Sequence, residues 1–450
     1  MRKLTVLSPT AILGYGFPKE SFERGLQHNP DVIAVDAGSV DPGPYYLGAG
    51  VSFTDKAAVK RDLEIILPAA RKRNIPVLIG SAGGAGAKPH LEWTEEIIKE
   101  IAAEQDLAFK LALIAADVDE ELLLDNLEST EPLGPIAPLN KETVQQTSNI
   151  VAQMGVEPIV AALDAGADVV LAGRAYDPTV FAAEAVRRGF DPGPALHMGK
   201  ILECAAIAAE PGSGRDCMVG ILDGDGFEIF PPNPQRQCTI KSVAAHSLYE
   251  KSNPWLLPGP GGSLDLQDTI YEQVEPGRVR VTGTRYVADK HYRLKLEGAR
   301  LVGYRTLAIA GIRDPLMIKE LRSILDAVSD SVRENFESVP DYKLNFLCYG
   351  LDGVMKELEP TPQPGHEVGL IIDVVAGTQD DANTICSYCR STLLHYGYPG
   401  RVSTAGNLAL PYSPSDLKAG PVYEFSVHHL LAVPVEFRPL IQEVGGKSDG

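Results

Sequence analysis

Short apolar runs and longer amphipathic segments take turns along the first part of the chain. Runs such as Asp31–Asp36 and Ala167–Ala172 are typical of buried strands, whereas Ala57–Arg73 places its apolar residues at helical spacing. Strands that alternate with helices favour a mostly parallel sheet covered by helices on both faces. We therefore predict an α/β fold for this part of the chain.

The same pattern gives the individual elements of this region. The predicted strands are Leu4–Leu7, Asp31–Asp36, Pro76–Ile79, Phe109–Ala116 and Ala167–Ala172. The predicted helices are Lys19–Leu26, Ala57–Arg73, Trp93–Glu104, Val118–Leu127, Gln145–Ala165, Thr179–Arg188 and Met198–Ala209.

The pattern changes after about Cys217, where short strand-like runs and Pro/Gly-rich breaks dominate. The predicted strands here are Met218–Leu222, Phe227–Phe230, Cys238–Ala245, Arg278–Val281, Tyr292–Leu296 and Arg300–Ile309. A long helix at Asp314–Phe336 follows, and then come the strands Leu344–Tyr349 and Val368–Val375, the helix Gln379–His395 and a strand near Tyr423–Val427. We expect an α/β domain at 1–216, a β-rich segment at 217–340, a smaller α+β domain at 341–446 and a disordered tail at 447–450.

Composition and charge limit the classes of function. The 450 residues carry a formal net charge of −19, which argues against a nucleic-acid-binding protein and against binding to an anionic membrane surface. No apolar run reaches the roughly 18 residues of a transmembrane helix, and Lys3–Leu7 is a better first strand than a signal peptide. Six cysteines are too few for a disulfide framework, so we expect a cytoplasmic location.

The stretch Ser81–Glu96 combines a glycine-rich turn with chemically active side chains between a predicted strand and a predicted helix. This is where α/β enzymes place ligands. Its glycines, which allow close approach of a ligand to the backbone, are Gly83, Gly84 and Gly86. Its titratable side chains are Lys88, His90 and Glu92. The spacing fits neither a phosphate-binding P-loop nor the dinucleotide fingerprint.

Further polar residues follow the other predicted parallel strands. Asp36 and Asp41 come after the second strand, and the segment Gly173–Pro178 adds Arg174, Tyr176 and Asp177 after the fifth. These residues should gather at the carboxyl edge of the sheet, where ligands bind in open parallel sheets. A structural interpretation is also open, because Asp is common in turns and Asp-Pro is a good helix start. Arg174 after a buried strand needs a carboxylate partner, either Asp177 or a substrate.

Three motifs, GSAGGAGAKPHLEWTEEI, GADVVLAGRAYDP and GDGFEIFPPNPQ, resemble the acyclic terpene utilization (AtuA-like) family over about residues 1–350. The smaller C-terminal unit resembles the ferredoxin-like domain that accompanies many members. The resemblance implies a cytoplasmic protein in the catabolism of branched or acyclic carboxylic acids, as such or as CoA thioesters. It also implies a small partner protein. The matching positions are Asp36, Gly83, Gly84, Gly86, His90, Glu92, Arg174 and Asp177.

These residues suggest a lyase of the hydratase/dehydratase type acting on a hydroxy or unsaturated carboxylic acid or its thioester. Such a reaction needs a base for the proton next to the carbonyl group and an acid for the departing hydroxyl. The candidate catalytic residues are His90, Glu92, Asp36 and Asp177. The candidate substrate-binding residues are Gly83, Gly84, Gly86, Lys88, Arg174 and Tyr176, with Arg174 holding the carboxylate. Mg²⁺ bridging Asp36 or Asp41 to the substrate is the expected cofactor.

Two other classes of function remain open at this point. A hydrolase would use a metal-activated water on an ester, lactone or thioester. A non-catalytic subunit would have its site completed by the small partner protein. The β-rich middle of the chain offers strand edges that a second copy can cover, so we also expect a homo-oligomer.

Overall fold

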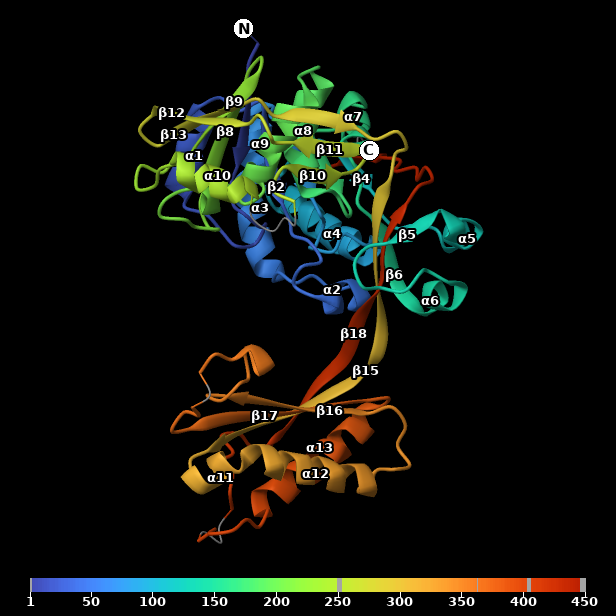
Figure 1. Cartoon of the computed structure of the whole chain (residues 1–450). Helices are drawn as coiled ribbons and strands as arrows, with labels where there is room; N and C mark the ends of the chain where they lie inside the picture. The colour runs from blue at the N-terminus through green and yellow to red at the C-terminus, as the bar shows by residue number, and fades with distance from the viewer. Residues whose placement is uncertain (1, 249–252, 362, 403–405, 446–450) are drawn as a thin grey trace. The chain divides into compact units, whose positions relative to one another are not determined.

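The structure is a computed structural model that describes residues 2–248, 253–361, 363–402 and 406–445. The chain divides into two compact units, unit 1 with Met1–Arg300 and Phe425–Gly450, and unit 2 with Leu301–Glu424. Figure 1 traces the chain from blue to red through both. The division differs from the expected boundaries at 217 and 341, because strands of the β-rich segment join the first sheet. The expected tail at 447–450 lies outside the described residues.

Unit 1 is built on a ten-stranded mixed sheet in the order β12-β13-β9-β8-β1-β2-β3-β7-β4-β19. Its parallel strands are β1 (Leu4–Ser8), β2 (Val32–Asp36), β3 (Val77–Gly80), β7 (Val169–Ala172) and β4 (Phe109–Ile114). Its antiparallel strands are β8 (Met218–Leu222), β9 (Gly226–Phe230), β12 (Ile270–Glu275), β13 (Arg278–Thr282) and β19 (Leu440–Val444). The α/β class is confirmed, and antiparallel strands extend the parallel centre on both sides.

Helices cover both faces of this sheet. The helices α1 (Lys19–Gln27), α3 (Lys56–Arg73) and α4 (Lys88–Glu104) share one apolar core with alternate residues of the parallel strands. The helices α7 (Glu157–Asp164), α8 (Asp177–Arg187) and α9 (Pro192–Leu202) pack on the strands from the opposite face. Successive strand residues point to opposite faces of the sheet. A strand that is apolar at nearly every position therefore packs against the helices on both faces.

The strands β3 and β7 are neighbours whose following segments go to opposite faces. The chain leaves β3 toward α4 on one face and leaves β7 toward α8 on the other. In open α/β sheets, ligands bind at the carboxyl ends of neighbouring strands whose connections reverse in this way. The loops 81–87 and 173–176 follow these two strand ends.

Two predicted elements of unit 1 were wrong. The predicted helix Gln145–Ala165 contains the end of α6 (Lys141–Gln146), strand β6 (Thr147–Ala152) and α7, and β6 pairs with β15 (Leu294–Ile312). The alternate residues Ile150 and Ala152 of β6 join an apolar cluster with β15, so tertiary pairing decides the strand. The predicted strand Cys238–Ala245 overlaps α10 (Ile240–Leu248), which buries Val243, His246 and Ser247 at helical spacing.

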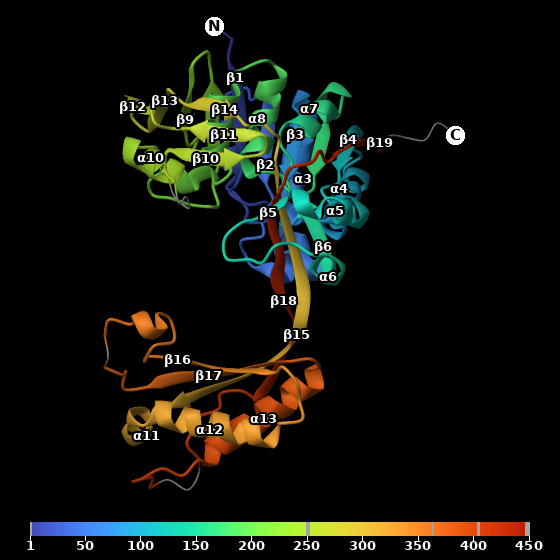
Figure 2. The same ribbon diagram turned by 45° about the vertical axis from the view of Figure 1, so that its right-hand side comes forward.

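Smaller elements complete unit 1. A three-stranded antiparallel sheet has the order β10 (Leu256–Gly259), β11 (Gly262–Asp265), β14 (Arg285–Ala288) and packs on α9, and Figure 2 shows its strands side by side. The remaining elements are α2 (Pro44–Ala49), α5 (Glu120–Asp125), β5 (Thr130–Pro132) and the 3₁₀ turns Leu127–Ser129 and Ala205–Ala208.

Unit 2 has the element order β-α-β-β-α-β, with its first strand in β15 and its last in β18 (Asp416–Leu431). Between them lie α11 (Pro315–Lys319), α12 (Leu321–Asn335), β16 (Lys343–Tyr349), the 3₁₀ turn Lys356–Leu358, β17 (Val368–Ala376) and α13 (Gln379–His395). The sheet order is β16-β17-β15-β18, and α12 and α13 cover one face of it (Figures 1 and 2). The predicted long helix is divided at Glu320, whereas α13 has the predicted bounds.

Candidate functional site

The loops after β3 and β7 contact each other closely. The Arg174 N–H donates to the Gly86 carbonyl oxygen at 3.1 Å, and the Ala175 N–H donates to Ser81 Oγ at 3.0 Å. A Cβ atom at Gly86, where φ is +70°, would lie 2.2 Å from the Arg174 nitrogen. The third glycine of the turn is therefore needed for the contact between the two loops.

Arg174 is held by carboxylates on two sides. Its side chain is 3% exposed, its Nε lies 2.6 Å from Glu297 Oε2, and its Nη1 lies 2.9 Å from Asp177 Oδ1. Nη1 also donates to Ser81 Oγ at 3.1 Å and to the Ala175 carbonyl oxygen. Its Nη2 makes no hydrogen bond with the residues that the structure describes. Two N–H donors of a fixed guanidinium thus stay available to a ligand.

Asp36 is a buried carboxyl group at the end of β2. Its Oδ1 accepts a hydrogen bond from the Gly38 N–H at 2.9 Å, and its side chain lies near the Asp177 carboxylate. Burial, and then the charge of Asp177, raise the pKa of Asp36 well above its ordinary value. A raised pKa favours the protonated form of Asp36, so this carboxyl group is a candidate proton donor.

A buried ion pair on α9 lies next to this group. Lys200 Nζ is 2.5 Å from Glu203 Oε1, and both side chains are almost fully buried. Burial lowers the pKa of Lys200, but the Glu203 carboxylate outweighs it and raises that pKa. Glu203 also raises the pKa of Asp36. We call Asp36, Arg174, Asp177 and this ion pair the polar cluster. Sequence reasoning missed both residues, although two charges inside an apolar helical run were a usable signal.

Glu297 is a second residue that sequence reasoning missed. Burial alone would raise its pKa, but Arg174 and Lys295 outweigh burial and lower the pKa to about 2. Lys295 Nζ lies 2.8 Å from Glu297 Oε1, and the Gln153 amide donates to the same oxygen at 3.3 Å. Glu297 and Asp41 line a hollow of about 530 Å³ in unit 1. The remaining lining residues are Val40, Leu133, Pro135, Ile136, Phe425 and His428.

The side chains of the glycine-rich stretch point elsewhere. His90 Nε2 lies 3.1 Å from the carbonyl oxygens of Tyr46 and Val51, so this nitrogen carries the proton and fastens α2 to α4. Burial lowers the pKa of His90. Lys88 and Glu92 are exposed on α4, with Nζ and Oε1 3.9 Å apart. None of these three interactions involves Asp36 or Arg174.

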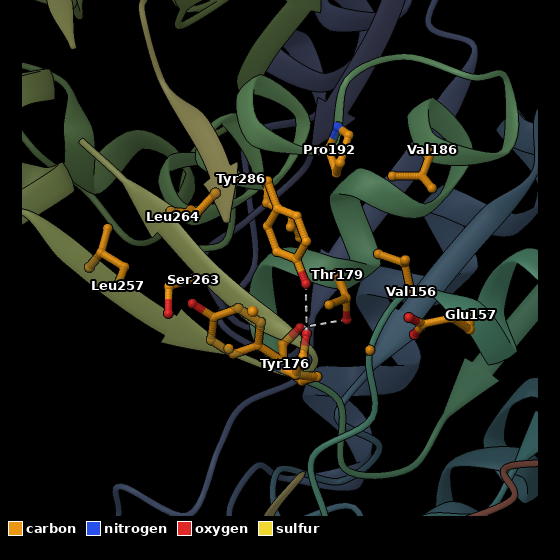
Figure 3. Close-up of a pocket in the computed structure, with 15 residues that line it drawn as sticks. Val156, Glu157, Tyr176, Thr179, Val186, Pro192, Leu257, Ser263, Leu264 and Tyr286 are labelled. Carbon is orange, nitrogen blue, oxygen red and sulfur yellow. Dashed lines mark hydrogen bonds between the residues drawn. The ribbon is translucent and has the colours of Figure 1, made fainter. Parts of the chain in front are cut away.

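The other two predicted glycines serve packing in the same turn. A Cβ atom at Gly83 would lie 2.9 Å from the Cβ of His90, and one at Gly84 would lie 2.5 Å from the Phe53 ring. Of the predicted residues, the structure brings together Asp36, Arg174 and Asp177. Tyr176, between the last two, lines a separate cavity (Figure 3).

Two further observations bear on cofactor and environment. In the part of the chain that the structure describes, no group of three or more His, Cys, Asp or Glu side chains is arranged to hold a metal ion. Mg²⁺ at Asp36 or Asp41 thus stays a prediction. Within the same residues, no helix combines the length and the apolar character needed to cross a bilayer.

Comparison with known proteins gives one positive result. The family model described as acyclic terpene utilisation family protein AtuA matches residues 55–214 and 223–413, which is most of the chain. The matched residues include the loops after β3 and β7 and the α9 ion pair. Searches of curated proteins and of solved structures gave no significant match.

Proposed function

The chain belongs to the acyclic terpene utilisation family AtuA, and on this premise we propose that it is a lyase of the hydratase/dehydratase type. The proposed substrate is a small branched or acyclic hydroxy or unsaturated carboxylic acid or its CoA thioester. The observation that carries the proposal is the burial of the Asp36 carboxyl group next to Asp177, which together raise its pKa.

Asp36 and Asp177 suit the two proton transfers of a dehydration. Asp177 takes the proton from the carbon next to the carbonyl group, and the electron pair of that C–H bond forms the double bond. The C–O bond of the hydroxyl breaks as Asp36 donates its proton to the oxygen, which leaves as water. Transfer of the proton from Asp177 to Asp36 restores the starting state, and hydration follows the reverse course. Two carboxyl groups in different environments commonly divide acid and base roles in this way.

Arg174 would bind the carbonyl or carboxylate oxygen of the substrate through Nη2. Its other nitrogens are fixed by Glu297, Asp177 and Ser81, so the guanidinium needs no reorganisation when the substrate binds. A cation at this oxygen also stabilises the negative charge that develops when the neighbouring proton leaves. The acid–base roles predicted for His90 and Glu92 are not part of this proposal, because their side chains contact other groups.

We also infer that unit 2 is the predicted ferredoxin-like domain. The support is its element order β-α-β-β-α-β and its strand order β16-β17-β15-β18. Such a unit is a reasonable binding element for the small partner protein, and no proposed step of the reaction uses it.

The experiment is to incubate the full chain in D₂O with 3-hydroxy-3-methylbutanoate and 3-methylbut-2-enoate, each as free acid and as CoA thioester, with and without Mg²⁺. Proton NMR follows the interconversion of the pair and the exchange of the hydrogens next to the carbonyl group. We expect interconversion that Asp36→Asn abolishes. Mg²⁺-dependent release of CoA from an otherwise unchanged acid would favour the hydrolase instead. Turnover that requires an added partner protein would favour the non-catalytic subunit.

A further inference from the structure

A cavity of about 190 Å³ lies in unit 1 between the helices α7–α9 and the small sheet β10–β11–β14. Figure 3 shows its lining residues converging from these elements. The apolar side chains of its wall are Val156, Val186, Pro192, Leu196, Leu257, Pro260 and Leu264. A cavity of about 150 Å³ with apolar walls can hold benzene, so this one has room for about six to eight non-hydrogen atoms.

The hydroxyl groups on the cavity wall differ in what they bond. Thr179 Oγ1 donates to the Tyr176 carbonyl oxygen at 2.6 Å, and the Tyr286 hydroxyl donates to the Pro260 carbonyl oxygen at 3.2 Å. The hydroxyl groups of Tyr176 and Ser263 make no hydrogen bond with the residues that the structure describes. Figure 3 shows the Tyr176 ring extending toward Ser263. Two donors on one side of the cavity therefore lack an acceptor among those residues.

The Tyr176 hydroxyl is both buried and unpaired, which is unfavourable, and a ligand oxygen next to it would relieve this cost. Burial and the Glu203 carboxylate raise the pKa of Tyr176, so its hydroxyl keeps its proton and stays a donor. The group that fits is thus a hydrogen-bond acceptor.

The charges around the cavity oppose an anionic ligand. Glu157 is on the wall, where it accepts a hydrogen bond from the Tyr292 hydroxyl at 3.0 Å. Among the described residues that line the cavity, none is Lys, Arg or His. The nearby Lys200 is bound to Glu203 at 2.5 Å. An acid would therefore lose its hydration here without gaining a cation.

We propose that this cavity binds a small, uncharged carbonyl compound, whose oxygen accepts hydrogen bonds from Ser263 and Tyr176. Asp36, Arg174 and Glu203 do not line this cavity, although the charge of Glu203 acts on Tyr176. The site in the cavity does not depend on the reaction proposed at Asp36. Its ligand chemistry is also different, because the polar cluster offers a guanidinium to an acid and this cavity offers neutral donors to a ketone, aldehyde or ester.

Three probes of the same shape test the proposal. The ketone 4-methylpentan-2-one carries the acceptor, 2,4-dimethylpent-1-ene replaces its oxygen by a methylene group, and 3-methylbutanoate replaces its methyl group by a charged oxygen. Dissociation constants are measured with the full chain by ligand-observed NMR titration. We expect the ketone to bind about threefold to tenfold more tightly than the alkene, the range that one net hydrogen bond supplies. The carboxylate should bind most weakly.

Variants then assign the contact. Tyr176→Phe and Ser263→Ala should each lower the affinity for the ketone toward that of the alkene and leave alkene binding unchanged. Tyr286→Phe is the matched control, because it removes a hydroxyl from the same wall that is already bonded to Pro260. It should leave the preference for the ketone intact. Val186→Phe should fill the cavity and weaken all binding.

The measurements can also overturn the proposal. Equal affinities for the ketone and the alkene would show that no hydrogen bond to the ligand oxygen contributes to binding. Tight binding of 3-methylbutanoate would show that the cavity does not select an uncharged ligand. Ketone binding that persists in Val186→Phe would place the site elsewhere, and absence of binding by all three probes would make the cavity a packing defect. Thermal unfolding of each variant shows that it is folded, so a loss of binding can be assigned to the site.

Discussion

Arg174 and Glu297 form a buried ion pair with an Nε–Oε2 distance of 2.6 Å, although they lie 123 positions apart in the sequence. The pair connects the loop after β7 to β15. Both side chains are at most 3% exposed, so each charge depends on the other for the interactions that water would otherwise give it. The pair fixes the guanidinium that we propose for substrate binding.

Glu297→Gln should lower the free energy of unfolding by about 3 kcal/mol, because it leaves a buried guanidinium with one carboxylate fewer. Urea denaturation measures the change. Asp268→Asn is the matched control, since it breaks an ion pair with Arg285 in the same unit whose side chains are 60% and 66% exposed. The control should lose much less, because solvent screens an exposed ion pair. If both variants lost the same free energy of unfolding, burial would not be the reason that the Arg174–Glu297 ion pair stabilises the fold.

The stabilisation by Glu297 should depend on pH at the acidic end. Its folded-state pKa of about 2 is below the ordinary value of 4.5, so the ionised form stabilises the fold. This contribution is fully present above the ordinary pKa of 4.5 and is lost as the pH falls toward about 2. The difference in unfolding free energy between the wild type and Glu297→Gln should therefore shrink from about pH 5 downward. A constant difference would show that the charge of Glu297 is not its source.

Asp36→Asn should keep the fold and remove turnover. Asn has the shape of the protonated carboxyl group but cannot supply its proton, so the rate should fall by about 10² to 10⁴. Because the pKa of Asp36 is raised in the folded state, its protonated form stabilises the fold. This contribution to the free energy of unfolding is fully present below the ordinary pKa of 3.8 and is lost as the pH rises through the folded-state pKa. Asp36→Asn should thus gain stability relative to the wild type as the pH rises from about 4 through that value. Unchanged turnover in Asp36→Asn would show that Asp36 is not the proton donor of the reaction.

The parallel centre of unit 1 was predictable because its strands are short apolar runs between helical segments. The strand β2 and the helix α3 begin within one residue of the predicted start. The strand β6 was not predictable, because its partner β15 is about 150 positions away and the local pattern of residues 145–165 also suits a helix. Pairing between distant strands is likewise the reason that β8 and β9 belong to the first sheet.

Some residues of the candidate site could likewise be predicted from the sequence, and others could not. Asp36, Arg174 and Asp177 could be predicted as neighbours, because parallel strands bring their carboxyl ends to one edge. Glu297 could not, since only the course of β15 brings it to Arg174. The motif around His90 was clear in the sequence, but its side-chain directions were not. In the structure His90 bonds to the backbone of α2, and Glu92 faces solvent.

His90→Leu should destabilise the protein, because the leucine cannot donate to the carbonyl oxygens of Tyr46 and Val51. A buried acceptor left without its donor costs about 1–3 kcal/mol. His90→Gln, whose amide can donate, should recover part of this loss. Thermal unfolding measures both variants. If both variants instead unfold like the wild type but lose turnover, His90 has the acid–base role first predicted for it.

Gly86→Ala should be the most damaging small substitution where the loops after β3 and β7 meet. The added Cβ would lie 2.2 Å from the backbone nitrogen of Arg174, and the backbone can yield to it only if the two loops separate. Gly134→Ala is the matched control in unit 1, because Gly134 has a similar φ of +73° but no atom within 4 Å of the methyl carbon that alanine would add. The control isolates the cost of a left-handed alanine, about 1–2 kcal/mol.

Gly86→Ala should exceed that cost in urea denaturation and also weaken binding of carboxylate substrates, since the Arg174 guanidinium would move. A loss no larger than in the control would mean that the loops tolerate separation, and the fixed position of Arg174 would then not rest on their contact.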